Sequence, residues 1–150
     1  MPKWRRYHAE HPELGRLAAF GKSGRRDGIV TTEAGGRRFT VTTGPKDRYV
    51  NASMRLSGLE PGRRYRISWF RKADGVTPLK NHAGFTVTLT VGGRMAIRHP
   101  EAGTVVGTTD WVLDMIEFVV PAEKTSLGFT LRDATGSVTV EDVLIEPLNR

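Results

Sequence analysis

Cysteine is missing from all 150 residues, which excludes disulfides, thiolate metal sites and cysteine nucleophiles. There is also no run of about 18 apolar residues, the length that a transmembrane helix needs. The basic N-terminal residues are followed by no apolar h-region, so we expect no secretory signal. The sequence contains no H-E-x-x-H pattern, no nucleophile elbow and no phosphate-binding glycine loop. We therefore predict a protein that is not an enzyme and does not insert into a membrane.

Acidic residues are scarce in the first half of the chain. Residues 1–72 hold 17 Lys and Arg against 6 Asp and Glu, a net charge of +11, whereas residues 73–150 hold 6 against 10, a net charge of −4. A basic surface attracts acidic partners. The arginine doublets are scattered between turns and strand ends, which argues against a nucleic-acid-binding protein. The uneven charge permits contact between copies, and we expect a homo-oligomer or larger assembly.

Alternation of apolar and polar residues with a period of two dominates the chain from Ile29 onward. The stretch that follows the Pro61-Gly62 turn places Tyr65, Ile67 and Trp69 on one face, because successive strand side chains point to opposite sides. Nine strands are predicted in this way, at residues 29–32, 38–42, 49–56, 64–72, 85–91, 95–99, 111–120, 127–132 and 138–145. Many short strands with this spacing and no long helix indicate a sandwich or barrel.

The predicted connections complete the organisation. Residues 73–84 should form a polar loop, residues 100–110 a connection with a short strand at 104–106, and residues 133–136 a turn. The β domain should span residues 28–150, after an irregular N-terminal arm at residues 1–27. The arm either packs over the sandwich or orders on a protein partner, and its candidate docking residues are Trp4, Arg5, Arg6 and Tyr7.

Two candidate sites lie on strand faces opposite the core. A binding face needs an aromatic ring for a sugar and polar groups for its hydroxyls, and the residues that fit are Tyr49, Asn51, Arg55, Arg66, Phe70 and Lys72. These positions are also compatible with an ordinary polar surface or with a face covered by the arm. Asp110 and Asp114 share one parity and Glu117 has the other, so we interpret them as the polar face of a strand, not an acid/base pair.

Three motifs together carry a family resemblance. Residues 59–65 follow the pattern L-x-P-G-x-x-Y, Trp111 is followed by Phe118 and Pro121, and residues 140–147 form a terminal strand with an acidic pair. This order resembles carbohydrate-binding modules of the galactose-binding-like jelly-roll type, over roughly residues 35–148. The resemblance implies a jelly-roll β-sandwich of two antiparallel sheets. It also implies possible functions in sugar binding and a structural Ca²⁺ held in part by Asp142, which could instead serve the local backbone.

The expected function is a non-catalytic binding or structural module. A single sandwich with a basic arm suits a virion surface component, such as a phage capsid decoration or tail accessory protein. The arm would then bind a capsid or tail protein, and the virion would be assembled in the host cytoplasm. The alternative is a soluble, extracellular carbohydrate-binding module associated with a glycan-active enzyme, and a small hydrolase on the same scaffold is a third interpretation.

Overall fold

The computed structural model describes residues 29–32, 38–44, 48–56, 59–101, 103–121 and 124–148. For residues 29–32 and Met54 it describes the backbone alone. The described residues form nine strands and no helix, and none of them belongs to a helix able to cross a membrane. The strands are β1 (Ile29–Thr32), β2 (Arg38–Thr42), β3 (Tyr49–Leu56), β4 (Arg64–Pro78), β5 (Gly84–Val91), β6 (Arg94–Arg98), β7 (Val112–Val119), β8 (Thr125–Arg132) and β9 (Ala134–Pro147).

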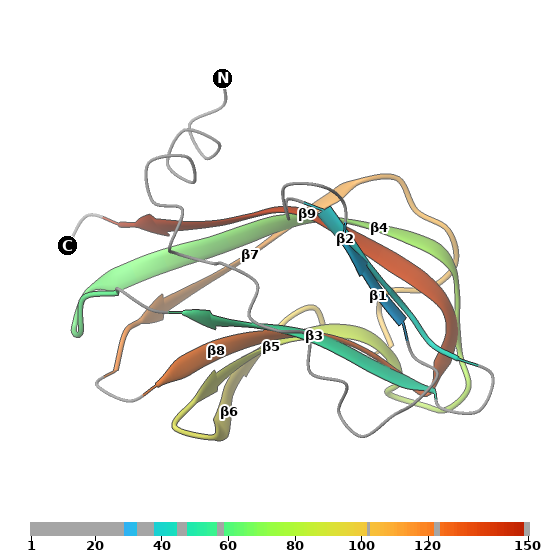
Figure 1. The fold of residues 1–150 in the computed structure, drawn as a ribbon, viewed down its shortest axis with the longest axis horizontal. Coiled ribbons are helices and arrows are strands. Elements are labelled where there is room, and N and C mark those ends of the chain that lie inside the picture. The colour runs from blue at the N-terminus through green and yellow to red at the C-terminus, as the bar shows by residue number, and fades with distance from the viewer. Residues whose placement is uncertain are drawn as a thin grey trace.

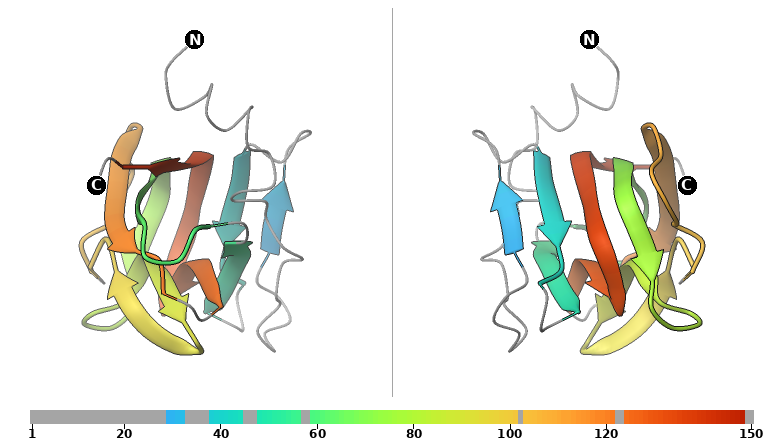
Figure 2. Two further views of the ribbon diagram at one scale, coloured as in Figure 1. Left: turned by 90° about the vertical axis from the view of Figure 1, so that its left-hand side faces the viewer. Right: turned by 90° about the vertical axis from the view of Figure 1, so that its right-hand side faces the viewer.

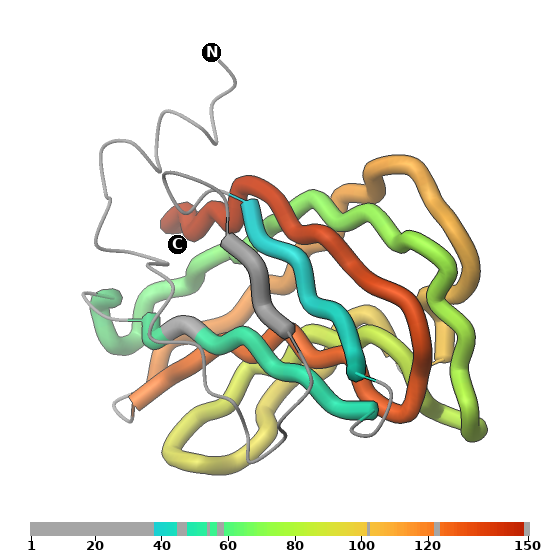
Figure 3. Tube along the Cα trace, turned by 45° about the vertical axis from the view of Figure 1, so that its right-hand side comes forward, coloured from blue at the N-terminus to red at the C-terminus, as the bar shows by residue number. Residues whose placement is uncertain are grey.

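The strands form two antiparallel sheets stacked face to face (Figure 1). One sheet has five strands in the order β1-β2-β9-β4-β7, which the right-hand view of Figure 2 shows from one edge to the other. The second has four strands in the order β3-β8-β5-β6. In both sheets, strands from the C-terminal part of the chain separate earlier ones: β9 lies between β2 and β4 (Figure 3), and β8 lies between β3 and β5. The predicted all-β sandwich is confirmed.

The core lies between the two sheets and contains the predicted alternating face of β4. Tyr65 is 4% exposed, and Ile67 and Trp69 are fully buried. Phe129 of β8 crosses the interface: its ring packs edge-on against Trp69, with 5.7 Å between centroids, and against Phe39, with 5.1 Å. Edge-to-face pairs of this kind add stabilisation beyond the burial of apolar area. The aromatic contacts therefore join the sheets at their centre.

β4 is longer than the sequence pattern indicates. The predicted loop at residues 73–84 is wrong for its first half, because the strand continues to Pro78. Ala73 and Val76 remain fully buried, and a shift in register between Asp74 and Thr77 keeps them on the core side. A bulge places an extra residue in one strand, so simple alternation fails there.

The predicted turn at residues 133–136 and the predicted short strand at 104–106 also need correction. Only Asp133, with φ of 48°, lies outside a strand, since β9 begins at Ala134. Residues 104–106 form no strand; the bridge in this connection joins Val76 to Gly107 instead. The hairpin between β5 and β6 is confirmed, with positive φ at both Gly92 and Gly93, as a two-residue primed turn requires.

Candidate functional site

The six predicted ligand-binding residues lie on opposite sides of the sandwich. Tyr49, Asn51 and Arg55 belong to β3 and point outward from the four-stranded sheet, because Val50, Ala52 and Leu56 point into the core. The remaining three, Arg66, Phe70 and Lys72, belong to β4 and point outward from the five-stranded sheet. The structure therefore brings each set of three together but does not unite them in one site.

The outer face of the four-stranded sheet is a polar surface with a small residue at its centre. Gly128 of β8 pairs with Ser53 of β3 on one side and with Thr88 of β5 on the other. A Cβ atom at Gly128 would lie 3.0 Å from Oδ1 of Asn51, so the missing side chain makes room for that amide. We call this surface the hydroxyl face. It consists of the outward residues Tyr49, Asn51, Ser53, Arg55, Thr86, Thr88, Thr90, Arg98, Ser126, Gly128, Thr130 and Arg132.

Hydrogen bonds hold part of the hydroxyl face and leave part of it open. Thr130 Oγ1 donates to Asn51 Oδ1 at 2.8 Å, which fixes the amide with its NH₂ group available. Thr86 Oγ1 donates to the Pro100 carbonyl at 2.7 Å. Ser53 and Thr88, by contrast, form no side-chain hydrogen bond with any residue that the structure describes. Oriented amide protons and free hydroxyls therefore lie together on rigid strands.

The outer face of the five-stranded sheet differs because its charges pair with one another. Arg66 donates from Nη2 to Glu117 Oε1 at 2.8 Å, and its Nη1 lies 3.7 Å from Glu146 Oε1. The hydrogen bond to Glu117 raises the pKa of Arg66 above its usual value. Lys72 Nζ lies 6.0 Å from the centre of the Trp111 ring. Arg66 is therefore neutralised and Lys72 is stacked within the chain itself.

Trp111 also contacts a second cation on this face. The guanidinium of Arg38 lies 5.5 Å from the centre of the indole ring, within the range of a cation–π interaction. Arg38 Nη2 is in addition 3.1 Å from Glu141 Oε2. The ring and its neighbouring cations form a cluster on this outer face, and Phe70 lies two residues before Lys72 on the same side of β4.

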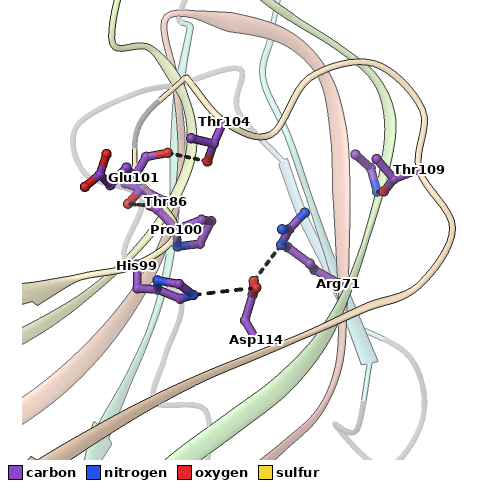
Figure 4. Close-up of polar contacts among 9 residues, drawn as sticks. Arg71, Thr86, His99, Pro100, Glu101, Thr104, Thr109 and Asp114 are labelled. Atoms are coloured by element: carbon purple, nitrogen blue, oxygen red, sulfur yellow. Dashed lines mark hydrogen bonds and ion pairs between the residues drawn. The ribbon is translucent and has the colours of Figure 1, made fainter.

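A charged cluster that sequence analysis missed lies between the sheets at the β7 edge (Figure 4). Asp114 is 6% exposed and points inward like Ile116 and Phe118, so its interpretation as part of a polar strand face is wrong. Arg71 Nε donates to Asp114 Oδ2, and His99 Nε2 lies 3.7 Å from Asp114 Oδ1. The signal was available: Arg71 has the parity of Trp69, and Asp114 that of Ile116.

Hydrogen bonds hold the connection between β6 and β7 next to this cluster. Thr109 Oγ1 accepts from the Ala73 amide at 3.1 Å, and Thr104 Oγ1 donates to the Glu101 carbonyl at 2.7 Å (Figure 4). Asp114 is engaged by Arg71, so it is not a free general base. The geometry fits a buried ion pair between β4 and β7, with His99 at the start of the connection lying beside it.

The predicted calcium ligand, Asp142, lies within the described residues, whereas the predicted arm does not. Asp142 is 8% exposed and has a φ of 53° in β9. Among the described residues, no group of three or more His, Cys, Asp or Glu side chains is placed to share a metal ion. A calcium site would thus depend on other ligands, and it stays a prediction. The predicted docking residues of the arm, Trp4, Arg5, Arg6 and Tyr7, lie outside the described residues.

Comparison with known proteins finds similar solved structures, whereas no protein-family model and no curated protein matches the sequence. Among solved structures, the enzymatically active domain of tailspike protein 4 from bacteriophage CBA120 is 16% identical over 83% of this chain, with a TM-score of 0.60. The chain covers 18% of that tailspike structure.

Carbohydrate-binding modules match over most of their own length. The CBM22-1 xylan-binding domain of Paenibacillus barcinonensis Xyn10C is 15% identical, with 85% of this chain and 84% of that domain covered and a TM-score of 0.53. A CBM4 structure is 18% identical, with 92% and 83% covered and a TM-score of 0.51. The chain thus has the jelly-roll fold of carbohydrate-binding modules, as the sequence resemblance predicts.

Proposed function

We propose that this protein is a non-catalytic glycan-binding module whose binding surface is the hydroxyl face of the four-stranded sheet. The observation that carries the proposal is the arrangement around Gly128, where the Asn51 amide lies close beside the glycine and the hydroxyl residues Ser53, Thr88 and Thr130 are neighbours on the paired strands. The fold shared with carbohydrate-binding modules supports the proposal.

The chemistry of the hydroxyl face suits sugars. Each sugar hydroxyl both donates and accepts hydrogen bonds, and the amide of Asn51 and the hydroxyls of Ser53 and Thr88 supply both functions. Tyr49, at the start of β3, is an aromatic residue at one corner of the face. Because these side chains stand on paired strands, little conformational entropy is lost when they bind.

The proposal is tested by displacing the Asn51 amide. Gly128→Val adds a side chain whose Cβ would lie 3.0 Å from Asn51 Oδ1, so the amide must move. Asn51 is an outward residue and the φ of this strand position suits any residue, so the sandwich should still fold. Wild-type protein should bind at least one polysaccharide in a glycan array and in affinity electrophoresis, and Gly128→Val should weaken that binding at least about tenfold.

A matched pair of hydroxyl deletions supplies the control. Thr88→Val removes a hydroxyl from the hydroxyl face, whereas Thr42→Val removes one from the outer face of the five-stranded sheet. Only the first substitution should reduce binding. Wild-type protein that binds no glycan, or a Gly128→Val variant that binds like wild type, would show that the proposal is wrong.

A virion is the setting that we propose for this module. The similarity to a domain of a phage tailspike protein supports that setting. In this proposal the N-terminal segment, with Trp4, Arg5, Arg6 and Tyr7, binds a capsid or tail protein during assembly in the host cytoplasm, and copies of the sandwich are displayed as an oligomer. The alternative setting is beside a glycan-active enzyme, as for the xylan-binding domain above.

Particles purified from an infected host distinguish these settings. Mass spectrometry should detect the full-length protein in particles, and deletion of residues 1–27 should prevent its incorporation while the circular dichroism of the β domain stays unchanged. A truncated protein that is still incorporated would eliminate the docking role of the arm. Detection in the culture medium in complex with a glycosidase, and not in particles, would support the alternative.

A further inference from the structure

The hydroxyl face carries positive charge without any negative charge. The four strands that build it, β3, β5, β6 and β8, contain no Asp or Glu. They contain four arginines, of which Arg55, Arg98 and Arg132 point outward on this face and are exposed. The five-stranded sheet is the opposite case, since its strands include acidic residues at Asp74, Asp114, Glu117, Glu141, Asp142 and Glu146.

The pairing of the arginines also differs between the sheets. On the five-stranded sheet, Arg38, Arg66 and Arg71 each form an ion pair with a carboxylate of the chain, and only Arg64, at the start of β4, forms none with a residue that the structure describes. On the hydroxyl face, Arg55, Arg98 and Arg132 have no ion-pair partner among the residues that the structure describes. Their charges are therefore available to a ligand.

The three free arginines surround the polar floor and do not follow a line. Arg55 lies opposite Ser126, Arg98 lies opposite Thr88, and Arg132 lies at the far end of β8 opposite Tyr49. With about 4.8 Å between strands and about 3.3 Å per residue, Arg55 and Arg132 are separated by roughly 20 Å along the sheet. A ligand that meets all three must be extended and must carry several negative charges.

We infer that the glycan bound by the hydroxyl face is an anionic polysaccharide, with carboxylate or sulfate groups that meet Arg55, Arg98 and Arg132. This inference rests on the proposed glycan-binding function. A planar guanidinium binds either group with two hydrogen bonds, while the hydroxyls and the Asn51 amide between the arginines bind the sugar hydroxyls.

Nucleic acid fits this surface less well than an acidic glycan does. Single-stranded nucleic acid binds through stacking of successive bases on aromatic rings, but Tyr49 is the one aromatic among the outward residues of these four strands. A duplex is bound by a basic stripe that follows its phosphates, and the arginines here stand at separate corners. Hydroxyl and amide groups fill the centre instead.

The test compares ligands that differ in charge. Isothermal titration calorimetry with polygalacturonate (carboxylate), dextran sulfate (sulfate), neutral xylan and an oligo-dT of similar length should show tightest binding to one of the two acidic polysaccharides. The better of the two identifies the anionic group. Binding of wild type should weaken between 50 and 300 mM NaCl, as counterions compete with the arginines.

Charge-removing variants give the second arm of the test. Each of Arg55→Gln, Arg98→Gln and Arg132→Gln should weaken binding about two- to fivefold, and the triple variant roughly ten- to a hundredfold with a smaller salt dependence. Arg64→Gln removes the same charge from an exposed position of β4 on the opposite sheet and should leave affinity unchanged.

The outcomes separate the inference from the function beneath it. Binding of neutral xylan that Gly128→Val abolishes, with no effect of the arginine variants, would keep glycan binding and overturn the anionic ligand. Absence of binding to every polysaccharide would overturn both. Preference for oligo-dT over both acidic polysaccharides would also overturn the inference, in favour of a nucleic-acid surface.

Discussion

Asp114 offers a direct test of the charged cluster at the β7 edge. We predict that Asp114→Ala strongly destabilises the protein, although the side chain is small and lies on an edge strand. The substitution removes the carboxylate that accepts from Arg71, whose side chain is 12% exposed. The guanidinium would then remain between the sheets without an anionic partner.

The magnitude follows from burial. Removing one member of a buried ion pair costs about 3–5 kcal/mol, because the other charge is left desolvated. We expect the lower end, about 3 kcal/mol, because His99 is half-exposed and water can approach the cluster from its side. For a domain of this size, about 2–4 °C per kcal/mol converts this to a fall in Tm of roughly 6–12 °C.

Two further variants show whether the charge or the shape matters. In Arg71→Met/Asp114→Leu both charges are replaced by apolar groups, so stability should return to within about 1 kcal/mol of wild type or exceed it. Glu117→Ala breaks the exposed pair with Arg66 on the other side of β7 and should cost less than about 1 kcal/mol.

Urea unfolding followed by tryptophan fluorescence measures these differences as changes in midpoint at constant m-value. The reasoning is refuted if Asp114→Ala costs no more than Glu117→Ala, or if the double variant is as unstable as the single one. The first result would mean that water solvates the cluster fully. The second would mean that the ion pair itself stabilises the fold, and that the loss in Asp114→Ala does not come from leaving Arg71 unpaired.

Three other substitutions test the packing by the same urea assay. Gly136→Ala should cost more than about 3 kcal/mol, because φ is 98° and the new Cβ would lie 2.5 Å from the Gly75 carbonyl oxygen. Gly75→Ala, where φ is 61° and the space is open, should cost only about 1–2 kcal/mol. Equal costs for the two variants would contradict the close approach of the two glycines. Phe129→Ala should cost about 3–5 kcal/mol through the cavity between the sheets, whereas a cost under 1 kcal/mol would show that the core can collapse around it. Thr43→Val should cost about 1–3 kcal/mol, because it leaves the buried Ala134 carbonyl without its 2.7 Å hydrogen bond, and an unchanged midpoint would count against that bond.

The sequence pattern was sufficient for the fold where each strand keeps a strict period of two. Tyr65, Ile67 and Trp69 alternate with polar residues, and all three are buried as predicted. Prediction failed where a bulge changes the count: Val76 and the Gly75–Gly136 approach lie in stretches that look like loops because of their glycines. Local patterns cannot show that two such stretches pair with each other.

The candidate site was predictable only in part, for a related reason. Alternation shows that Asn51 and Arg66 both point away from the core, but it does not tell which sheet each strand joins. Pairing of β3 with β8 and of β4 with β9 separates the two residues onto opposite surfaces. The charged residues Arg71 and Asp114 were missed because polar residues were assumed to face water, although their parity places them inside.

The order of strands has a consequence for synthesis. β3 joins its sheet through β8, and β2 joins β4 through β9. Each sheet therefore depends on one connecting strand, and these two strands, β8 and β9, leave the ribosome after the other seven. Nascent chains that stop before Thr125 hold separate hairpins and unpaired edges that invite aggregation. We therefore expect the sandwich to form late and in one cooperative step, after translation of the whole domain, at the slow rates that long-range strand pairing imposes.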